Sequence, residues 1–318
     1  MRALFSALLL IGAVAAEAQA QSDYPSRPVR LIVPSEPGGG TDISARILAE
    51  RLSQAMGQQF VIENRPGAGQ MIGTEQVARS PNDGYTLLVA AAAITILPAT
   101  NPNVKFDILR DFVPVSQLVS SPSMLVTPTK LPFNSLKEFI AGVKAKPGGY
   151  DFGSAGPGTQ PHMAMELFRV MAGLDMQHIP YKGIAPALNG VIAGQVSSII
   201  INPLTAKSQI EAGNVRGLGI SSTTRSAIMP DLPAIAEAVP GYEAIQWYGL
   251  FAPAGTPSPV IARLHKEIAA ALKSPAMQKR LAADGADAVG NSPAEFTAQI
   301  KSELEKWAKV AKAAKIGK

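Results

Sequence analysis

Two glycine-rich turns hold the residues that are best suited to bind an anion. The first is Pro37-Gly38-Gly39-Gly40-Thr41-Asp42, and the second is Gly153-Ser154-Ala155-Gly156-Pro157-Gly158-Thr159. Each turn follows an apolar run and precedes an amphipathic stretch, so each delivers backbone N–H groups to the start of a helix. Such a start has unpaired donors and roughly +0.5 charge, which attracts anions. Two such turns predict a carboxylate-bearing ligand held between two lobes.

Side chains near the second turn offer an alternative, nucleophilic chemistry. His162 could serve as a general base to Ser154 or Thr159, which would make the chain a secreted hydrolase or transferase. The usual enzyme motifs are incomplete, however, because Phe152 stands where a Gly-x-Ser-x-Gly turn needs its first glycine. Pro161 likewise replaces the third glycine of a dinucleotide fingerprint, and no phosphate-binding loop follows any glycine run. We therefore predict a binding protein rather than an enzyme, with no catalytic residue, no metal site and no cofactor.

The elements that must position the turns alternate between short apolar runs and amphipathic stretches, which is typical of an α/β protein. A strand at Val29–Val33 and a helix at Thr41–Met56 are predicted to flank the first turn. A strand at residues 150–154 and a helix at residues 161–172 are predicted to flank the second. Ile245–Ala252 is predicted to cross back between the lobes. Further strands are predicted at 60–63, 85–90, 113–119, 123–127, 177–180, 197–201 and 216–221, and further helices at 72–79, 136–145, 185–193, 205–211, 258–272, 276–283 and 293–314.

The first residues predict an export signal. Arg2 precedes an apolar run from Leu4 to Ala16, and Ala18-Gln19-Ala20 is a small-x-small cleavage site, so we expect cleavage after Ala20. The chain has no cysteine, which excludes disulfides and the acylated cysteine of a lipoprotein anchor. Its net charge of +5 comes from scattered basic residues, which is more typical of a solvated surface than of a nucleic-acid site. We expect a monomer that is not anchored to the membrane and does not bind nucleic acid.

A series of motifs along essentially the whole mature chain resembles one family, the periplasmic substrate-binding proteins of tripartite tricarboxylate transporters, also called Bug or TctC-like proteins. The motifs are specific because they occur together in the family's order. They are Pro28-Val29-Arg30-Leu31-Ile32-Val33-Pro34, the first turn Pro37-Gly38-Gly39-Gly40-Thr41-Asp42, Glu63-Asn64-Arg65-Pro66-Gly67-Ala68-Gly69, Asp83-Gly84-Tyr85-Thr86-Leu87-Leu88, Asp111-Phe112, Ser154–Thr159 with His162, His178-Ile179-Pro180-Tyr181-Lys182-Gly183, and Trp247-Tyr248-Gly249-Leu250-Phe251-Ala252-Pro253.

The resemblance implies a two-lobed Venus-flytrap fold of type II, in which each lobe is a mixed sheet flanked by helices. With residues 1–20 as the signal peptide, residues 21–122 and 247–318 would form lobe one and residues 123–246 lobe two. The protein would capture a small organic acid in the periplasm and deliver it to the permease subunits of the transporter. A ligand-loaded sensor that docks on a receptor kinase would use the same cleft, so this reading stays open beside transport.

The resemblance also implies the ligand contacts. Glu36 departs from the family because relatives usually have an apolar residue or proline there; it either faces solvent or meets an ammonium group, which would suit an amino-acid-like ligand. Gln70 and Met71 replace the usual Gly-Asn at one rim of the cleft, and Lys182 is a candidate cation near it. The implied contacts are Gly39, Gly40, Thr41 and Asp42 in lobe one, Ala92 in the segment that lines the cleft, and Ser154, Gly156, Gly158, Thr159 and Asn202 in lobe two, with Glu36, His162 and Lys182 as further candidates.

Overall fold

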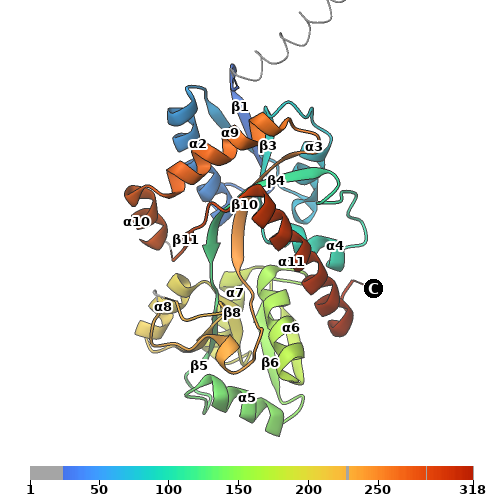
Figure 1. Ribbon diagram of the computed structural model, residues 1–318. Helices are drawn as coiled ribbons and strands as arrows, with labels where there is room; N and C mark the ends of the chain where they lie inside the picture. Colours follow the sequence, from blue (N-terminus) through green and yellow to red (C-terminus); the bar gives the residue numbers. More distant parts are fainter. Residues whose placement is uncertain (1–23, 227–228, 284, 318) are drawn as a thin grey trace, which may run out of the picture.

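The computed structural model describes residues 24–226, 229–283 and 285–317, arranged as two groups of strands with helices around each (Figure 1). The predicted signal peptide therefore lies outside the described residues. The strands are β1 (Val29–Val33), β2 (Phe60–Asn64), β3 (Thr86–Ala91), β4 (Phe112–Ser121), β5 (Met124–Pro128), β6 (Tyr150–Ser154), β7 (Met176–Pro180), β8 (Ile199–Ile201), β9 (Val215–Ile220), β10 (Gln246–Pro253) and β11 (Asp287–Ala288). The helices are α2 (Gly40–Met56), α3 (Met71–Ala78), α4 (Ala93–Thr100), α5 (Leu136–Ala145), α6 (Gln160–Ala172), α7 (Ile184–Ala193), α8 (Pro203–Glu211), α9 (Ser258–Leu272), α10 (Pro275–Ala283) and α11 (Pro293–Ala314), with short 3-10 turns at Ala68–Gln70 and Ile235–Glu237.

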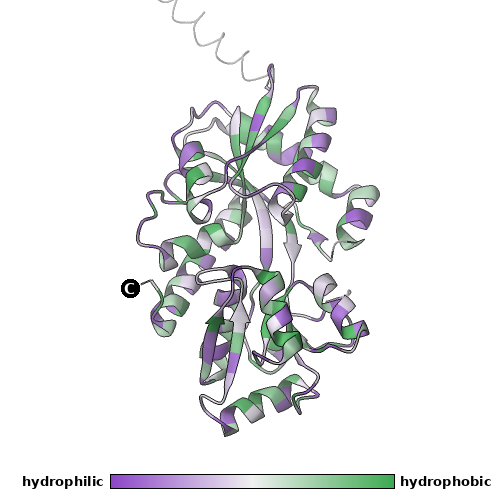
Figure 2. Cartoon of the chain, turned by 180° about the vertical axis from the view of Figure 1, so that it is seen from behind, coloured by the Kyte–Doolittle hydropathy of each residue, from purple (hydrophilic) through white to green (hydrophobic). Residues whose placement is uncertain are grey.

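The first lobe is built on a mixed sheet with the strand order β11-β4-β10-β3-β1-β2. β1 pairs in parallel with β2 and β3, whereas β10 is antiparallel to β3 and β4. Alternate side chains of a strand point to opposite faces. Leu31 accordingly packs with α2 and α9 on one face, while Ile32 packs with α3, α4 and α11 on the other. Because both faces are covered, the inner strands β1 and β3 are mainly apolar, with Arg30 and Thr86 as their polar residues (Figure 2).

The second lobe contains a three-stranded antiparallel sheet, β8-β5-β9, and a parallel pair, β6-β7. The two sheets meet where the Gly153 amide donates to the Ser198 carbonyl at 2.8 Å. Helices α5 and α6 cover one face of these strands, where Phe139 and Phe168 are fully buried. Helix α7 packs on the other face. The lobe is therefore a mixed α/β unit, as predicted.

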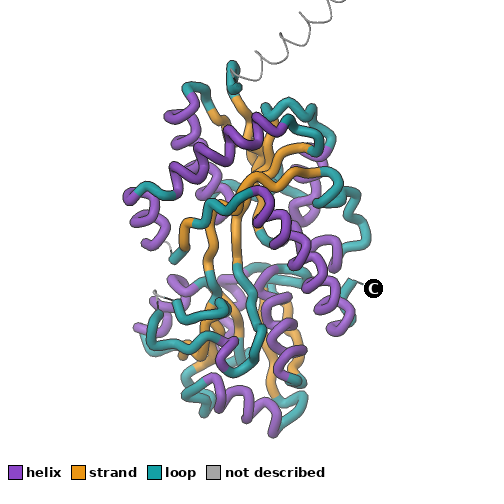
Figure 3. The backbone as a smooth tube through the Cα atoms, viewed as in Figure 1, coloured by secondary structure: helices purple, strands orange, loops and turns teal. Residues whose placement is uncertain are grey.

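Two strands connect the lobes. β4 and β10 pair side by side from Phe112 with Pro253 to Ser121 with Gln246, and both lead from the first lobe into the second (Figures 1 and 3). The chain leaves the first lobe where β4 ends and returns where β10 begins, next to the predicted boundaries at 122 and 246; the exact division stays a prediction. Helix α11 also contacts both lobes, because Ile300 packs with the first and Trp307 with the second.

Two elements are absent from the sequence prediction. Helix α4 follows the Ala91–Ala93 segment directly, and the two-residue strand β11 pairs with the end of β4. α4 has only eight residues, contains Pro98 and buries Thr95 against Glu303 of α11, so it lacks the apolar periodicity that identifies a surface helix. Within the described residues, no helix is long and apolar enough to cross a bilayer.

Candidate functional site

The first glycine turn leaves several backbone donors without an acceptor. β1 ends at Val33, and α2 begins at Gly40 with Gly39 as its N-cap. No hydrogen bond within the described ranges uses the N–H groups of Gly39, Gly40 or Thr41. These N–H groups lie at the N-terminus of α2. The helix dipole there adds to their attraction for an anion. The start of α2 thus offers N–H donors of the kind that an anion accepts from.

Asp42 holds this turn in place from inside. Its Oδ2 accepts from the Gly38 amide and from Arg46 Nε, each at 2.9 Å, and its Oδ1 accepts from Asn64 Nδ2 at 3.0 Å. Only 2% of Asp42 is exposed. The hydrogen bond from Arg46, with those from Gly38 and Asn64, outweighs burial and lowers the pKa of Asp42 to about 2. The carboxylate is therefore ionised and already satisfied, and its role in this conformation is to shape the turn.

The second turn uses its donors differently. The Gly156 amide donates to Ser154 Oγ at 3.0 Å, the Gly158 amide to His162 Nδ1 at 3.0 Å, and the Thr159 amide to the Gly156 carbonyl at 3.3 Å. The Thr159 hydroxyl donates to the same carbonyl at 2.7 Å. The N–H groups of Gly156, Gly158 and Thr159 are therefore hydrogen-bonded to nearby residues of the chain. The three open N–H groups of the first turn have no such acceptor in the described part of the chain. The sequence predicts two equivalent anion sites, but the geometry makes them unequal.

Two stacked histidines support the second turn. The rings of His162 and His178 lie 3.8 Å apart, and His178 Nε2 is 2.7 Å from Ser154 Oγ. Burial lowers the pKa of His178 to about 4, and the adjacent His162 adds to this effect. His162 Nε2 lies 3.6 Å from Glu166. The histidine beside Ser154 is thus His178 and not the predicted His162, and Ser154 itself is fully buried.

Three cavities lie in the region between the lobes. The largest, about 530 Å³, is bordered by Gly40 and Asn202; a second of about 330 Å³ is bordered by Gly158 and Thr159; and a third of about 200 Å³ shares Asn202 with the first. Four of the predicted contacts, from both lobes, therefore face these openings. The remaining predicted contacts, Gly39, Thr41, Asp42, Ala92, Ser154 and Gly156, do not border these three cavities.

The further candidates lie in different surroundings. Glu36 and Lys182 are exposed, and neither borders the three cavities, whereas His162 is buried. Ala92 is also buried, with 2% exposed, and its neighbour Ala93 borders the 330 Å³ cavity instead. Gln70 borders the same cavity and has a positive φ of 81°, which is unusual for a residue with a side chain. Gln70 therefore lies at the rim of this cavity, and its effect on the shape of the cleft stays a prediction.

Tyr248 is the residue that sequence reasoning missed. It borders both the 530 Å³ and the 200 Å³ cavity, and its hydroxyl lies so close to Gly40 that a methyl group there would overlap it. Burial raises the pKa of Tyr248, so its hydroxyl keeps a proton to donate. The signal was present in the Trp247-Tyr248-Gly249 motif, which places an aromatic hydroxyl on the strand that connects the lobes. Within the described ranges, no three His, Asp or Glu side chains are grouped so that they could hold a metal ion.

Comparison with known proteins is consistent with this architecture. Residues 44–316 match the model of the tripartite tricarboxylate transporter family receptor. The chain is 39% identical to protein BugT of Bordetella pertussis, over 90% of this chain and 89% of that protein. It is similar to the structure of Rpa4515 of R. palustris with adipate, at 36% identity and a TM-score of 0.78 over 92% of this chain and 99% of that one. It is also similar to MatC of Rhodopseudomonas palustris with bound malate, at 30% identity and a TM-score of 0.74 over 90% and 99% of the two chains. The two-lobed fold, the open donors at α2 and these matches together place the chain in the tripartite tricarboxylate transporter receptor family, the Bug-type periplasmic binding proteins.

Proposed function

We propose that the protein captures a small carboxylate in the periplasm, between its two lobes, and delivers it to the permease subunits of a tripartite transporter. The observation that carries this proposal is the set of open N–H groups at Gly39, Gly40 and Thr41, beside a cavity that both lobes border. The relatives named above support it, because one was solved with adipate and another with malate.

Backbone donors alone do not provide enough affinity. A helix start contributes about 0.3–1 kcal/mol, or up to about 2 kcal/mol when partly buried. A micromolar complex needs about −8 kcal/mol. The remainder must come from closure of the lobes, which excludes water and aligns several charge-assisted hydrogen bonds at about 1.5–3 kcal/mol each. In the closed form, the Thr159 hydroxyl and Asn202 would meet the ligand from the second lobe.

A thermal-shift screen of organic acids and amino acids tests the proposal first, because a ligand of the folded state raises the melting temperature. Calorimetry on Gly39→Val and Thr159→Ala then tests the site. A Cβ atom at Gly39 would have only the Glu36 carbonyl within 4 Å, at 3.8 Å. The Gly39→Val variant should therefore fold and bind the ligand more weakly. Thr129→Ala, an exposed threonine of the second lobe, is the matched control. Unchanged affinity in both site variants would refute the site.

We further propose that the ligand is not altered by the protein, that the protein is a monomer, and that export removes residues 1–20. Ligand recovered unchanged after saturable binding supports the first statement, whereas turnover that disappears in His162→Ala would favour the hydrolase. Sedimentation of the purified protein tests the second. The intact mass of the exported protein tests the third, since cleavage elsewhere than after Ala20 would give a different mass.

A further inference from the structure

The 530 Å³ cavity extends well beyond the predicted anion site. Gly40, the first residue of α2, borders it, and so do Arg280 and Leu281 of α10. Its volume lies within the range of about 300–1,000 Å³ that is usual for ligand pockets. A ligand whose carboxylate is held at Gly40 therefore has room to continue toward α10.

Several of the side chains that border this cavity are apolar. Ile43 and Ile47 of α2 border it, together with Val119 of β4 and Leu281 of α10. Ile43 is 43% exposed, so its apolar surface is accessible to a ligand in the cavity. These side chains suit a hydrocarbon segment.

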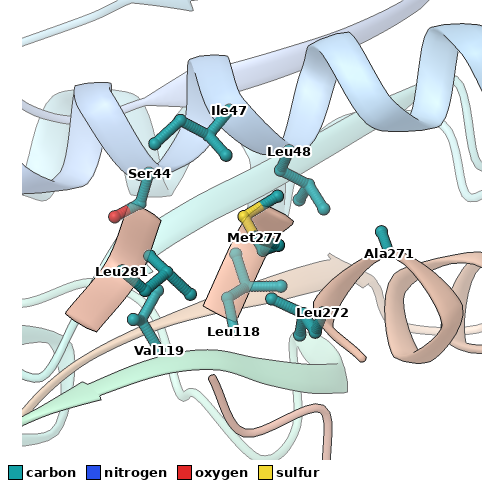
Figure 4. A pocket seen from close by; sticks show the side chains of 9 residues that line it. All are labelled: Ser44, Ile47, Leu48, Leu118, Val119, Ala271, Leu272, Met277 and Leu281. Atoms are coloured by element: carbon teal, nitrogen blue, oxygen red, sulfur yellow. The ribbon is translucent and has the colours of Figure 1, made fainter. Parts of the chain in front are cut away.

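Helix α10 is fixed firmly enough to act as a wall. Figure 4 shows Met277 and Leu281 of α10 packed against Ile47 and Leu48 of α2, with Leu272 at the end of α9 beside them. Met277 and Leu281 are each almost completely buried. The position of Arg280, next to Leu281 in the chain, is therefore set by the packing of this helix and not by a free loop.

Arg280 of α10 supplies a positive charge at the border of this cavity. It is exposed, and no Asp or Glu of the described ranges forms an ion pair with it. A guanidinium group matches the geometry of a carboxylate and binds it through two parallel hydrogen bonds. The cavity is thus bordered by anion-binding groups on both α2 and α10 and by apolar side chains of α2, β4 and α10.

We propose that this part of the cleft is a distal subsite for the second acidic group of an elongated diacid, with Arg280 as the residue that sets this specificity. The proposal rests on the proposed function, because it assumes that the first carboxylate binds at the start of α2. It identifies the substrate class as acids that carry two anionic groups separated by an apolar chain.

Calorimetry with straight-chain diacids and monoacids of equal length, adipate and hexanoate among them, tests this subsite. The wild-type protein should bind the best diacid more tightly than its monoacid. Arg280→Gln should weaken diacid binding by about 10- to 100-fold, as expected for the loss of a charge-assisted contact, and change monoacid binding by less than about twofold. Lys279→Gln is the matched control, because Lys279 is an exposed cation on the same helix that does not border the cavity.

The outcomes separate the subsite from the proposed function. Equal effects of Arg280→Gln on diacids and monoacids, no effect on either, or an equal effect of Lys279→Gln would overturn the subsite while leaving carboxylate binding intact. A wild-type protein that binds monoacids as tightly as diacids would also overturn the subsite while leaving carboxylate binding intact. A wild-type protein that binds no organic acid at all would overturn the subsite and the proposed function together.

Discussion

The carboxylate of Asp42 should contribute more to the stability of the first turn than any other single side chain. Its two oxygens accept three hydrogen bonds, from Gly38, Arg46 and Asn64. In Asp42→Asn, one oxygen becomes an amide that faces a donor. Hydrogen bonds to charged groups contribute about 1.5–3 kcal/mol each, and asparagine retains one acceptor, so we expect a loss of about 2–3 kcal/mol in the free energy of unfolding at pH 7.

The pH dependence gives this prediction a second, independent readout. The folded pKa of Asp42 is about 2, against 3.8 for an ordinary aspartate. Because the folded pKa is lowered, the stabilisation is complete above pH 4 and is lost as the pH falls toward 2. This difference corresponds to about 2.4 kcal/mol at most, and solvent around the half-exposed Arg46 reduces it to about 1–2 kcal/mol. The gap between wild type and variant should therefore narrow by about 0.5–1 kcal/mol from pH 5 to pH 3.

Urea unfolding at pH 7, 5 and 3, followed by the fluorescence of the buried Trp247 and Trp307, measures both effects. Glu63→Gln is the control, because its partner Arg30 is 42% exposed and such pairs contribute less than about 1 kcal/mol. Asp42→Asn that is as stable as wild type at pH 7 would refute the reasoning. A gap that is the same at pH 5 and pH 3 would refute the assigned pKa.

Three further predictions test other contacts. Gly40→Ala should destabilise the protein by about 1–3 kcal/mol because the methyl group overlaps the Tyr248 hydroxyl. Tyr248→Phe in the same chain should recover part of this loss, and additive losses in urea unfolding would contradict the contact. The folded pKa of His178 is lowered to about 4, so stability should fall by about 1–2 kcal/mol as the pH drops from 7 toward 4. His178→Gln should flatten this slope in melting curves, and an unchanged slope would exclude His178 as its source. Glu303 Oε1 accepts from the buried Trp247 Nε1 at 2.9 Å. Glu303→Ala removes this acceptor and should lower the free energy of unfolding in urea by about 2–4 kcal/mol. A loss below about 0.5 kcal/mol would show that the Trp247 donor finds another partner.

The local elements could be predicted from the sequence because each depends on its own pattern. The run Val29–Val33 and the helix after Gly40 form as expected, since apolar alternation and a glycine turn act over a few residues. β10 crosses between the lobes as its apolar and aromatic composition indicates. The prediction fails for α4, which is short, contains Pro98 and buries Thr95 against Glu303 of the distant helix α11.

The properties of the site were harder to predict because they depend on residues that are distant in the chain. The N–H donors of the second turn bond to partners within four residues, but the contact of Ser154 with His178 spans 24 residues and depends on the fold. The approach of Tyr248 to Gly40 joins the first helix to the last strand between the lobes. Arg280 reaches the cleft through the packing of α10 on α2, which no local pattern indicates.

The central claim is that the open amides of the first turn bind the carboxylate of the ligand. An NMR titration of ¹⁵N-labelled protein with the acid found in the thermal-shift screen tests this most directly, by following the amide signals of Gly39 and Gly40. We predict that these signals shift with the dissociation constant measured by calorimetry and do not respond to the primary amide of the same acid. Signals that stay in place when the protein is saturated with ligand would contradict the claim.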